Sequence, residues 1–152
     1  MSNVSDYHGW PHLCLSAYDS PRQLLNDGDR VYRFLKELPE KIGMHMLGLP
    51  IVYRIGEQDH VDPGVTGIVV IATSHIAYHS FAQGLKNGKK KPRGIQRKIF
   101  RPFFTLDVFS CAEFDPDIVL KEVKRVFKPR FIETALIYRL REEEEMIEVE
   151  DF

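Results

Sequence analysis

Three side chains that could act together in catalysis lie in two apolar stretches of this 152-residue chain. The β-branched run Gly64–Phe81 carries Ser74 and His79, and the run Leu106–Cys111 ends in one of only two cysteines. A serine, an imidazole and a thiol can act as nucleophile, base and proton donor. Because one hairpin could bring Ser74, His79 and Cys111 together, we expect the two stretches to form one active site.

Other kinds of site fit these residues less well. The Gly-x-Ser-x-Gly signature of hydrolases is absent. His75 and His79 would share one face of a helix, but the β-branched run before them favours a strand. No acidic third ligand is close in sequence, so we predict no metal site. From the residues alone, an inert hairpin with two hydrogen-bonded histidines and a buried thiol stays an alternative, and for Cys14 a buried thiol is expected.

Length and charge narrow the class of protein. A chain of 152 residues fits one domain with a single hydrophobic core. The formal net charge of −1 gives no overall field for nucleic acid or membranes, and no apolar run is long enough to span a bilayer. The first ten residues lack the basic and apolar regions of a signal peptide. We therefore expect a cytoplasmic protein with no membrane partner, and nucleic-acid binding is not expected.

The spacing of apolar residues predicts alternating strands and helices. A capping side chain followed by proline marks two helix starts, at Pro21 and at Pro116. The expected strands span 12–18, 46–55 (bulged or at an edge because of Pro50), 67–81 (with a break near Ser74 allowed), 103–111 and 131–140, and the expected helices span 21–41 and the segment from 115 to Pro129. This order predicts an α+β fold, a two-layer sandwich with an antiparallel sheet and both helices on one face.

Two segments differ in composition from the rest of the predicted single domain (1–152). Residues 84–102 contain eight basic residues, no acidic residue and several glycines and prolines, so we expect a basic inserted loop. Residues 142–152 form an acidic tail that we expect to be solvated.

The combination of motifs resembles the S-adenosylmethionine decarboxylase proenzymes of bacteria and archaea. The resemblance extends from about residue 12 to the last predicted strand and includes the Asp-Pro start of the second helix. The motifs that carry it are Thr66-Gly67-Ile68-Val69-Val70-Ile71, Ser74-His75-Ile76, His79-Ser80-Phe81 and Leu106-Asp107-Val108-Phe109-Ser110-Cys111.

This resemblance implies that the chain cleaves itself between Thr73 and Ser74, giving a β chain of residues 1–73 and an α chain of residues 74–152. The Ser74 hydroxyl would attack the Thr73 carbonyl and form an ester, with Thr66 hydrogen-bonded to the intermediate. His79 would remove the Ser74 α-proton, and elimination and hydrolysis would leave a covalent pyruvoyl group (pyruvate as cofactor) at the new terminus.

The implied activity is decarboxylation. A pyruvoyl carbonyl forms a Schiff base with the substrate amine and takes up the charge left by the carboxylate. Cys111 matches the proton donor of the family. The resemblance also implies a homodimer of cleaved protomers, a small amino-acid-type substrate and a role in polyamine (spermidine) biosynthesis.

The sequence departs from the family around the substrate. Thr73 stands where glutamate is usual, Ser16 replaces an acidic residue of the first strand, and Gln83 replaces the glutamate that holds the substrate ribose. His60 loosely matches an aromatic that stacks on adenine. Two enzyme hypotheses follow: an S-adenosylmethionine decarboxylase, favoured because that activity is common in the family, or a pyruvoyl decarboxylase of arginine or ornithine. A third hypothesis is that the chain is a structural or regulatory subunit that does not cleave itself.

Overall fold

The structure, a computed structural model, describes residues 9–59, 62–85 and 97–140. Its strands are β1 (Trp10–Tyr18), β2 (Met46–Ile55), β3 (Gly64–Ile71), β4 (Ser74–Phe81), β5 (Phe103–Ser110) and β6 (Phe131–Arg139). Its helices are α1 (Arg22–Leu25), α2 (Gly28–Lys41) and α3 (Pro116–Phe127), with short 3-10 turns η2 (Glu57–Asp59) and η3 (Arg97–Phe100).

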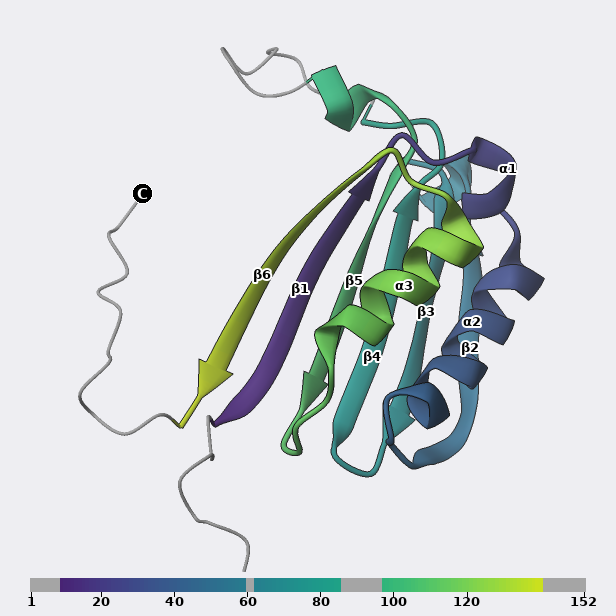
Figure 1. Cartoon of the computed structure of the whole chain (residues 1–152). Coiled ribbons are helices and arrows are strands. Elements are labelled where there is room, and N and C mark those ends of the chain that lie inside the picture. Colours follow the sequence, from purple (N-terminus) through teal and green to yellow (C-terminus); the bar gives the residue numbers. More distant parts are fainter. Residues whose placement is uncertain (1–8, 60–61, 86–96, 141–152) are drawn as a thin grey trace, which may run out of the picture.

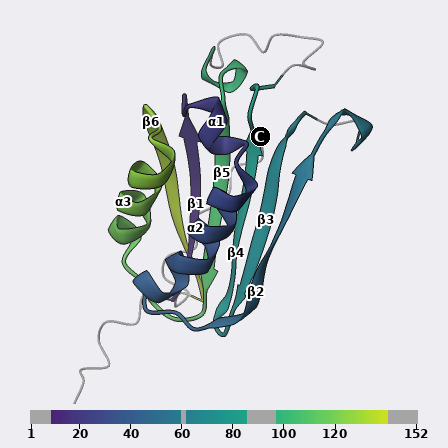
Figure 2. The ribbon, with the colours of Figure 1, turned by 90° about the vertical axis from the view of Figure 1, so that its right-hand side faces the viewer.

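The six strands form one antiparallel sheet in the order β2-β3-β4-β5-β1-β6. Both long helices, α2 and α3, lie on the same face of this sheet (Figures 1 and 2). The predicted α+β fold, a two-layer sandwich with helices on one face, is confirmed. Within the described residues, no helix is long and apolar enough to cross a membrane.

The strand predicted over 67–81 is two strands joined by a tight turn. β3 ends at Ile71 and β4 begins at Ser74, so the turn consists of Ala72 and Thr73. Ile71 pairs with Ser74 across this turn. The prediction of one strand was wrong, apart from the break that it allowed near Ser74. Neither turn residue is glycine or proline, so the sequence carries none of the usual signals for a reversal there.

The helix predicted over 21–41 is also divided, into α1 and α2. Asp27 caps α2, and its carboxylate accepts a 3.1 Å hydrogen bond from the N–H of Arg30. This cap begins a new helix where a continuous one was predicted. Pro39 lies inside the last turn of α2.

The other predicted elements are confirmed to within one or two residues at each end. β2 is an edge strand whose register shifts between Leu47 and Ile51, as expected for a strand that contains Pro50. Asp115 caps α3 by accepting a 2.9 Å hydrogen bond from the N–H of Asp117.

Parts of two predicted segments lie outside the described residues. These are 86–96 of the basic loop and the whole acidic tail. At the described ends of the loop, Leu85 N–H donates a 2.8 Å hydrogen bond to the carbonyl of Ile99.

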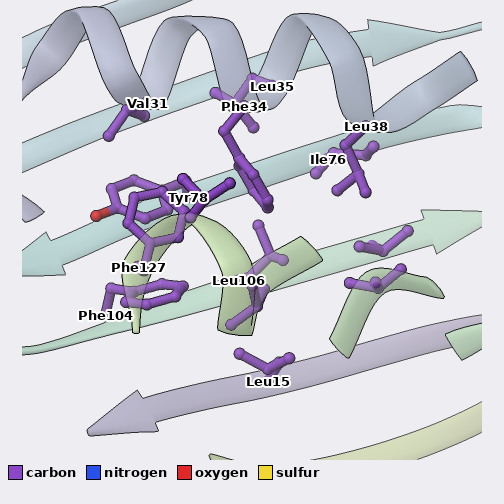
Figure 3. Close-up of a cluster of buried hydrophobic side chains, with 14 of the residues drawn as sticks. Leu15, Val31, Phe34, Leu35, Leu38, Ile76, Tyr78, Phe104, Leu106 and Phe127 are labelled. Carbon is purple, nitrogen blue, oxygen red and sulfur yellow. The ribbon is translucent and has the colours of Figure 1, made fainter. Parts of the chain in front are cut away.

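The hydrophobic core lies between the sheet and the helices. Phe127 of α3 packs on Tyr78 of β4 and on Phe104 of β5, with ring centroids 5.3 and 4.7 Å apart (Figure 3). Gly67 allows α2 to approach β3 closely, because a Cβ at that position would lie 2.8 Å from Cδ1 of the buried Leu35. Large rings and one small residue thus set the spacing of the two layers.

The other face of the sheet, called here the open face, has no described helix against it. Side chains along β1, β4 and β5 alternate between the core and this face. The open face carries the polar side chains of His12, Cys14, Ser16, His75, His79, Thr105 and Asp107. It also carries apolar side chains that are between 39% and 66% exposed: Ile51, Tyr53, Ile68 and Val70.

Candidate active site

The peptide between Thr73 and Ser74 lies in the tight turn that joins β3 to β4. The N–H of Cys111 donates a 2.9 Å hydrogen bond to the carbonyl oxygen of Thr73. This bond continues the β4–β5 pairing, in which Ser74 lies opposite Ser110. The turn is therefore attached to the end of β5, and the sequence prediction that Ser74 and Cys111 lie close together agrees with the fold.

Ser74 has an unusual backbone conformation, with a φ of 150°. Residues other than glycine seldom adopt positive φ, and such strain is concentrated at functional sites. Its Oγ lies 2.9 Å from Nδ1 of His75. Sequence reasoning placed His75 near the site but gave it no role, whereas this contact makes it the histidine positioned to exchange a proton with the Ser74 hydroxyl.

Ser110 is a second residue that sequence reasoning missed. It is fully buried, and its hydroxyl donates a 2.9 Å hydrogen bond to Oγ1 of Thr73 while accepting a 3.0 Å bond from the N–H of Ala112. The Thr73 hydroxyl in turn lies 3.1 Å from Sδ of Met44. The only sequence signal was a hydroxyl at a core-facing position of an apolar strand, directly before Cys111.

Cys111 follows the last residue of β5, and its side chain is exposed. The exposed thiol can therefore reach a small molecule that enters beside Ser74. The other cysteine, Cys14, was expected to be buried but is only partly so, and it lies on β1.

His79 and Thr66 form a separate group. They are cross-strand partners on β4 and β3, and His79 packs edge-on against Phe81, with ring centroids 4.8 Å apart. Burial lowers the pKa of the half-buried His79 imidazole, which favours the neutral, proton-accepting form. A group that can take up a proton is thus held on the open face.

Within one chain, His79 is not close to Ser74. The two residues are at opposite ends of a six-residue stretch of extended β4, and five steps along a strand correspond to about 17 Å between their Cα atoms. The predicted site residues therefore fall into two groups, which we call the turn group (Thr73, Ser74, Cys111) and the strand group (Thr66, His79).

The predicted substrate-binding residues lie with the strand group or outside the described chain. Gln83 is half-buried in the turn that follows β4, beyond His79 and far along the strand from Ser74. His60 is outside the described residues.

Comparisons with known proteins agree with the sequence resemblance. The family model described as S-adenosylmethionine decarboxylase matches residues 11–140. The S-adenosylmethionine decarboxylase proenzyme of Methanococcus vannielii is 24% identical over 129 residues, which cover 84% of this chain and 87% of that protein. The crystal structure of the adenosylmethionine decarboxylase from Aquifex aeolicus has the same fold, with a TM-score of 0.64 at 18% identity over 91% of this chain and 96% of that one. This chain belongs to the S-adenosylmethionine decarboxylase family of carboxy-lyases.

Proposed function

We propose that this chain is a pyruvoyl-dependent S-adenosylmethionine decarboxylase that matures by cleaving itself between Thr73 and Ser74. The two products would be residues 1–73 and 74–152, and the decarboxylated substrate would serve polyamine synthesis. The main support is the Thr73–Ser74 peptide itself, which combines a hydrogen-bonded carbonyl with a positive φ at Ser74.

Cleavage would begin with attack of the Ser74 hydroxyl on the carbonyl carbon of Thr73. The N–H of Cys111 stabilises the negative charge that develops on the carbonyl oxygen. Nδ1 of His75 accepts the hydroxyl proton, the C–N bond breaks, and the nitrogen takes up a proton, leaving an ester. A residue in a rare φ region is destabilised by about 1–3 kcal/mol, and rearrangement of the peptide would release that strain.

The ester would then be converted by loss of the Ser74 α-proton and departure of the Thr73 carboxylate. Water would hydrolyse the resulting enamine and release ammonia. The place of Ser74 fits the product, because it begins a strand at the end of the sheet and lies near the exposed Cys111 thiol. A pyruvoyl group supplies an electron sink for decarboxylation. Cys111 would donate a proton to the substrate carbon that has lost its carboxylate.

The two groups of site residues support a homodimer. Because His79 is about 17 Å along β4 from Ser74, a second copy is the better source of the base. The exposed apolar side chains Ile68 and Val70 lie on the same face as His79, and a partner would bury them. A twofold contact between open faces would bring the strand group of each copy to the turn group of the other and complete two sites.

Mass spectrometry of the purified protein tests the cleavage. We expect two fragments that meet between residues 73 and 74, with residue 74 converted to pyruvoyl, and a single chain of about 17.7 kDa for Ser74→Ala. A wild-type chain that stays whole would instead support the non-processing subunit.

Release of CO₂ from S-adenosylmethionine, arginine and ornithine tests the substrate. Gln83 favours a pyruvoyl decarboxylase of arginine or ornithine, because an amide makes a weaker contact with a ribose hydroxyl than a carboxylate does. Turnover of arginine or ornithine with none of S-adenosylmethionine would overturn our preferred substrate while leaving the cleavage mechanism intact.

A further inference from the structure

Three side chains of types that can bind metals are clustered on the open face, and none of them belongs to the turn group or the strand group. His12 and Cys14 are on β1, and Asp107 is on β5 directly opposite Cys14. Nε2 of His12 lies 3.1 Å from Oδ1 of Asp107, and the imidazole nitrogen, the thiol sulfur and the carboxylate oxygen all lie within 4.8 Å of one another. It is the one group of this kind found among the described residues.

We propose that His12, Cys14 and Asp107 form a binding site for a divalent transition-metal cation of the zinc type. This inference does not depend on the proposed decarboxylase activity. It departs from the sequence prediction of no metal site, because the histidine and the aspartate are 95 positions apart and only strand pairing brings them together.

The strand geometry suits such a site. Residues two apart on a strand point to the same face, and directly opposed residues have their Cβ atoms about 5 Å apart. Zinc bonds of about 2.0–2.3 Å in a tetrahedron place the donor atoms roughly 3.3–3.8 Å apart. Donor atoms already within 4.8 Å need only small side-chain rotations to reach that spacing.

The donor types decide which cation fits. A thiolate with an imidazole favours zinc or a neighbouring transition metal over the oxygen-preferring Mg²⁺ and Ca²⁺.

Space is available for a fourth ligand. Cys14 and Asp107 line a hollow of about 400 Å³ together with Ser16, Thr105 and Glu133. Glu133 accepts a 3.1 Å hydrogen bond from the Tyr18 hydroxyl, which holds its carboxylate over that part of the sheet. Three protein ligands with a fourth position open to a hollow are the arrangement of zinc sites that also hold water or another molecule.

Titration of the chelator-treated full chain with Co²⁺ tests the site, because a thiolate ligand gives a charge-transfer absorption band. We expect the band to saturate at one Co²⁺ per chain and to disappear when Zn²⁺ is added. Cys14→Ala should abolish it, and Asp107→Asn should weaken binding at least about tenfold. Cys111→Ser is the matched control and should leave the band unchanged.

Absence of the Co²⁺ band in the wild-type chain would overturn the proposal and leave the three residues as a hydrogen-bonded cluster. A band that survives in Cys14→Ala would overturn it as well.

Discussion

The backbone N–H of Cys111 donates a 2.9 Å hydrogen bond to the carbonyl oxygen of Thr73. One residue therefore contributes to the site in two ways, with its amide on the peptide before Ser74 and its exposed thiol free to reach a substrate. Because the amide belongs to the backbone and the thiol to the side chain, substitution can separate the two contributions.

Replacing Cys111 by serine should leave self-cleavage intact and impair decarboxylation. The N–H that binds the Thr73 carbonyl is retained, whereas the proton donor becomes a far weaker acid. General acid–base groups contribute about 10²–10⁴-fold, so we expect kcat to fall by about 100-fold or more. Fragment mass and CO₂ release from the same preparation measure both effects. Loss of cleavage in Cys111→Ser would show that the thiol, and not the amide, acts on the Thr73 carbonyl.

Replacing Ser110 by alanine should slow cleavage. The variant leaves the Ala112 N–H without its side-chain partner and removes the bond that the Thr73 hydroxyl accepts, although Thr73 keeps its contact with Sδ of Met44. The turn that holds the Thr73–Ser74 peptide should therefore become less ordered. We expect cleavage to slow about tenfold and the free energy of unfolding to fall by about 1–3 kcal/mol, because two hydrogen bonds are lost. Precursor decay on denaturing gels and urea unfolding provide the measurements.

Ser80→Ala is the matched control for that variant. Ser80 is also a fully buried serine, but it bonds the Leu25 carbonyl (3.1 Å) and the Val65 N–H (2.9 Å), at the other end of β4. The Ser80→Ala variant should lose a similar free energy of unfolding and should still cleave itself at the wild-type rate. Equal slowing in both variants would mean that cleavage follows overall stability and that Ser110 has no specific role.

Replacing His75 or His79 by alanine should block cleavage at different steps. His75→Ala removes the group 2.9 Å from the Ser74 hydroxyl, so the precursor should remain an ordinary amide. His79→Ala should allow the acyl shift but block α-proton removal, so an ester should accumulate. Hydroxylamine cleaves esters and spares amides, and should therefore split only the His79→Ala precursor at position 73. An ester in His75→Ala would contradict the role given to His75.

Mixed dimers should show that His79 acts between chains. When Ser74→Ala and His79→Ala chains of different tag length are co-expressed, the His79→Ala chain keeps Ser74 and receives His79 from its partner. We expect that chain to be cleaved in the mixed dimer and to stay whole when expressed alone. An uncleaved chain in a purified mixed dimer would place the base in the same chain as the serine.

The pH dependence of cleavage should reflect the buried position of His79. Burial lowers the pKa of its imidazole, and the base is active when neutral. Its neutral form therefore persists to lower pH than that of an exposed histidine, whose pKa is about 6.5. The rate of precursor decay should therefore fall with a midpoint below about pH 6.5, as the imidazole becomes protonated. A rate that already falls on going from pH 8 to pH 7 would contradict this assignment.

Much of this protein could be predicted from the sequence, because local patterns determine local structure. The period-2 and helical spacing of apolar residues, Asp115 before Pro116 and the position of Pro50 predicted most of the elements and their two-layer arrangement. The motifs around Ser74 and Cys111 led to the correct family. These features depend on the side-chain periodicity of strands and helices and on capping, which involve neighbouring residues only.

Tertiary structure decided what depends on pairing between distant segments. The reversal at Ala72 and Thr73 has no turn residues to mark it, so only the register of β3 with β4 reveals that Ser74 begins a strand. The same register separates His79 from Ser74 by the length of an extended strand. Strand pairing between β1 and β5 likewise assembles His12, Cys14 and Asp107 from positions with no sequence relationship. Local propensity acts over a few residues, whereas the contacts that build these sites are formed by the sheet as a whole.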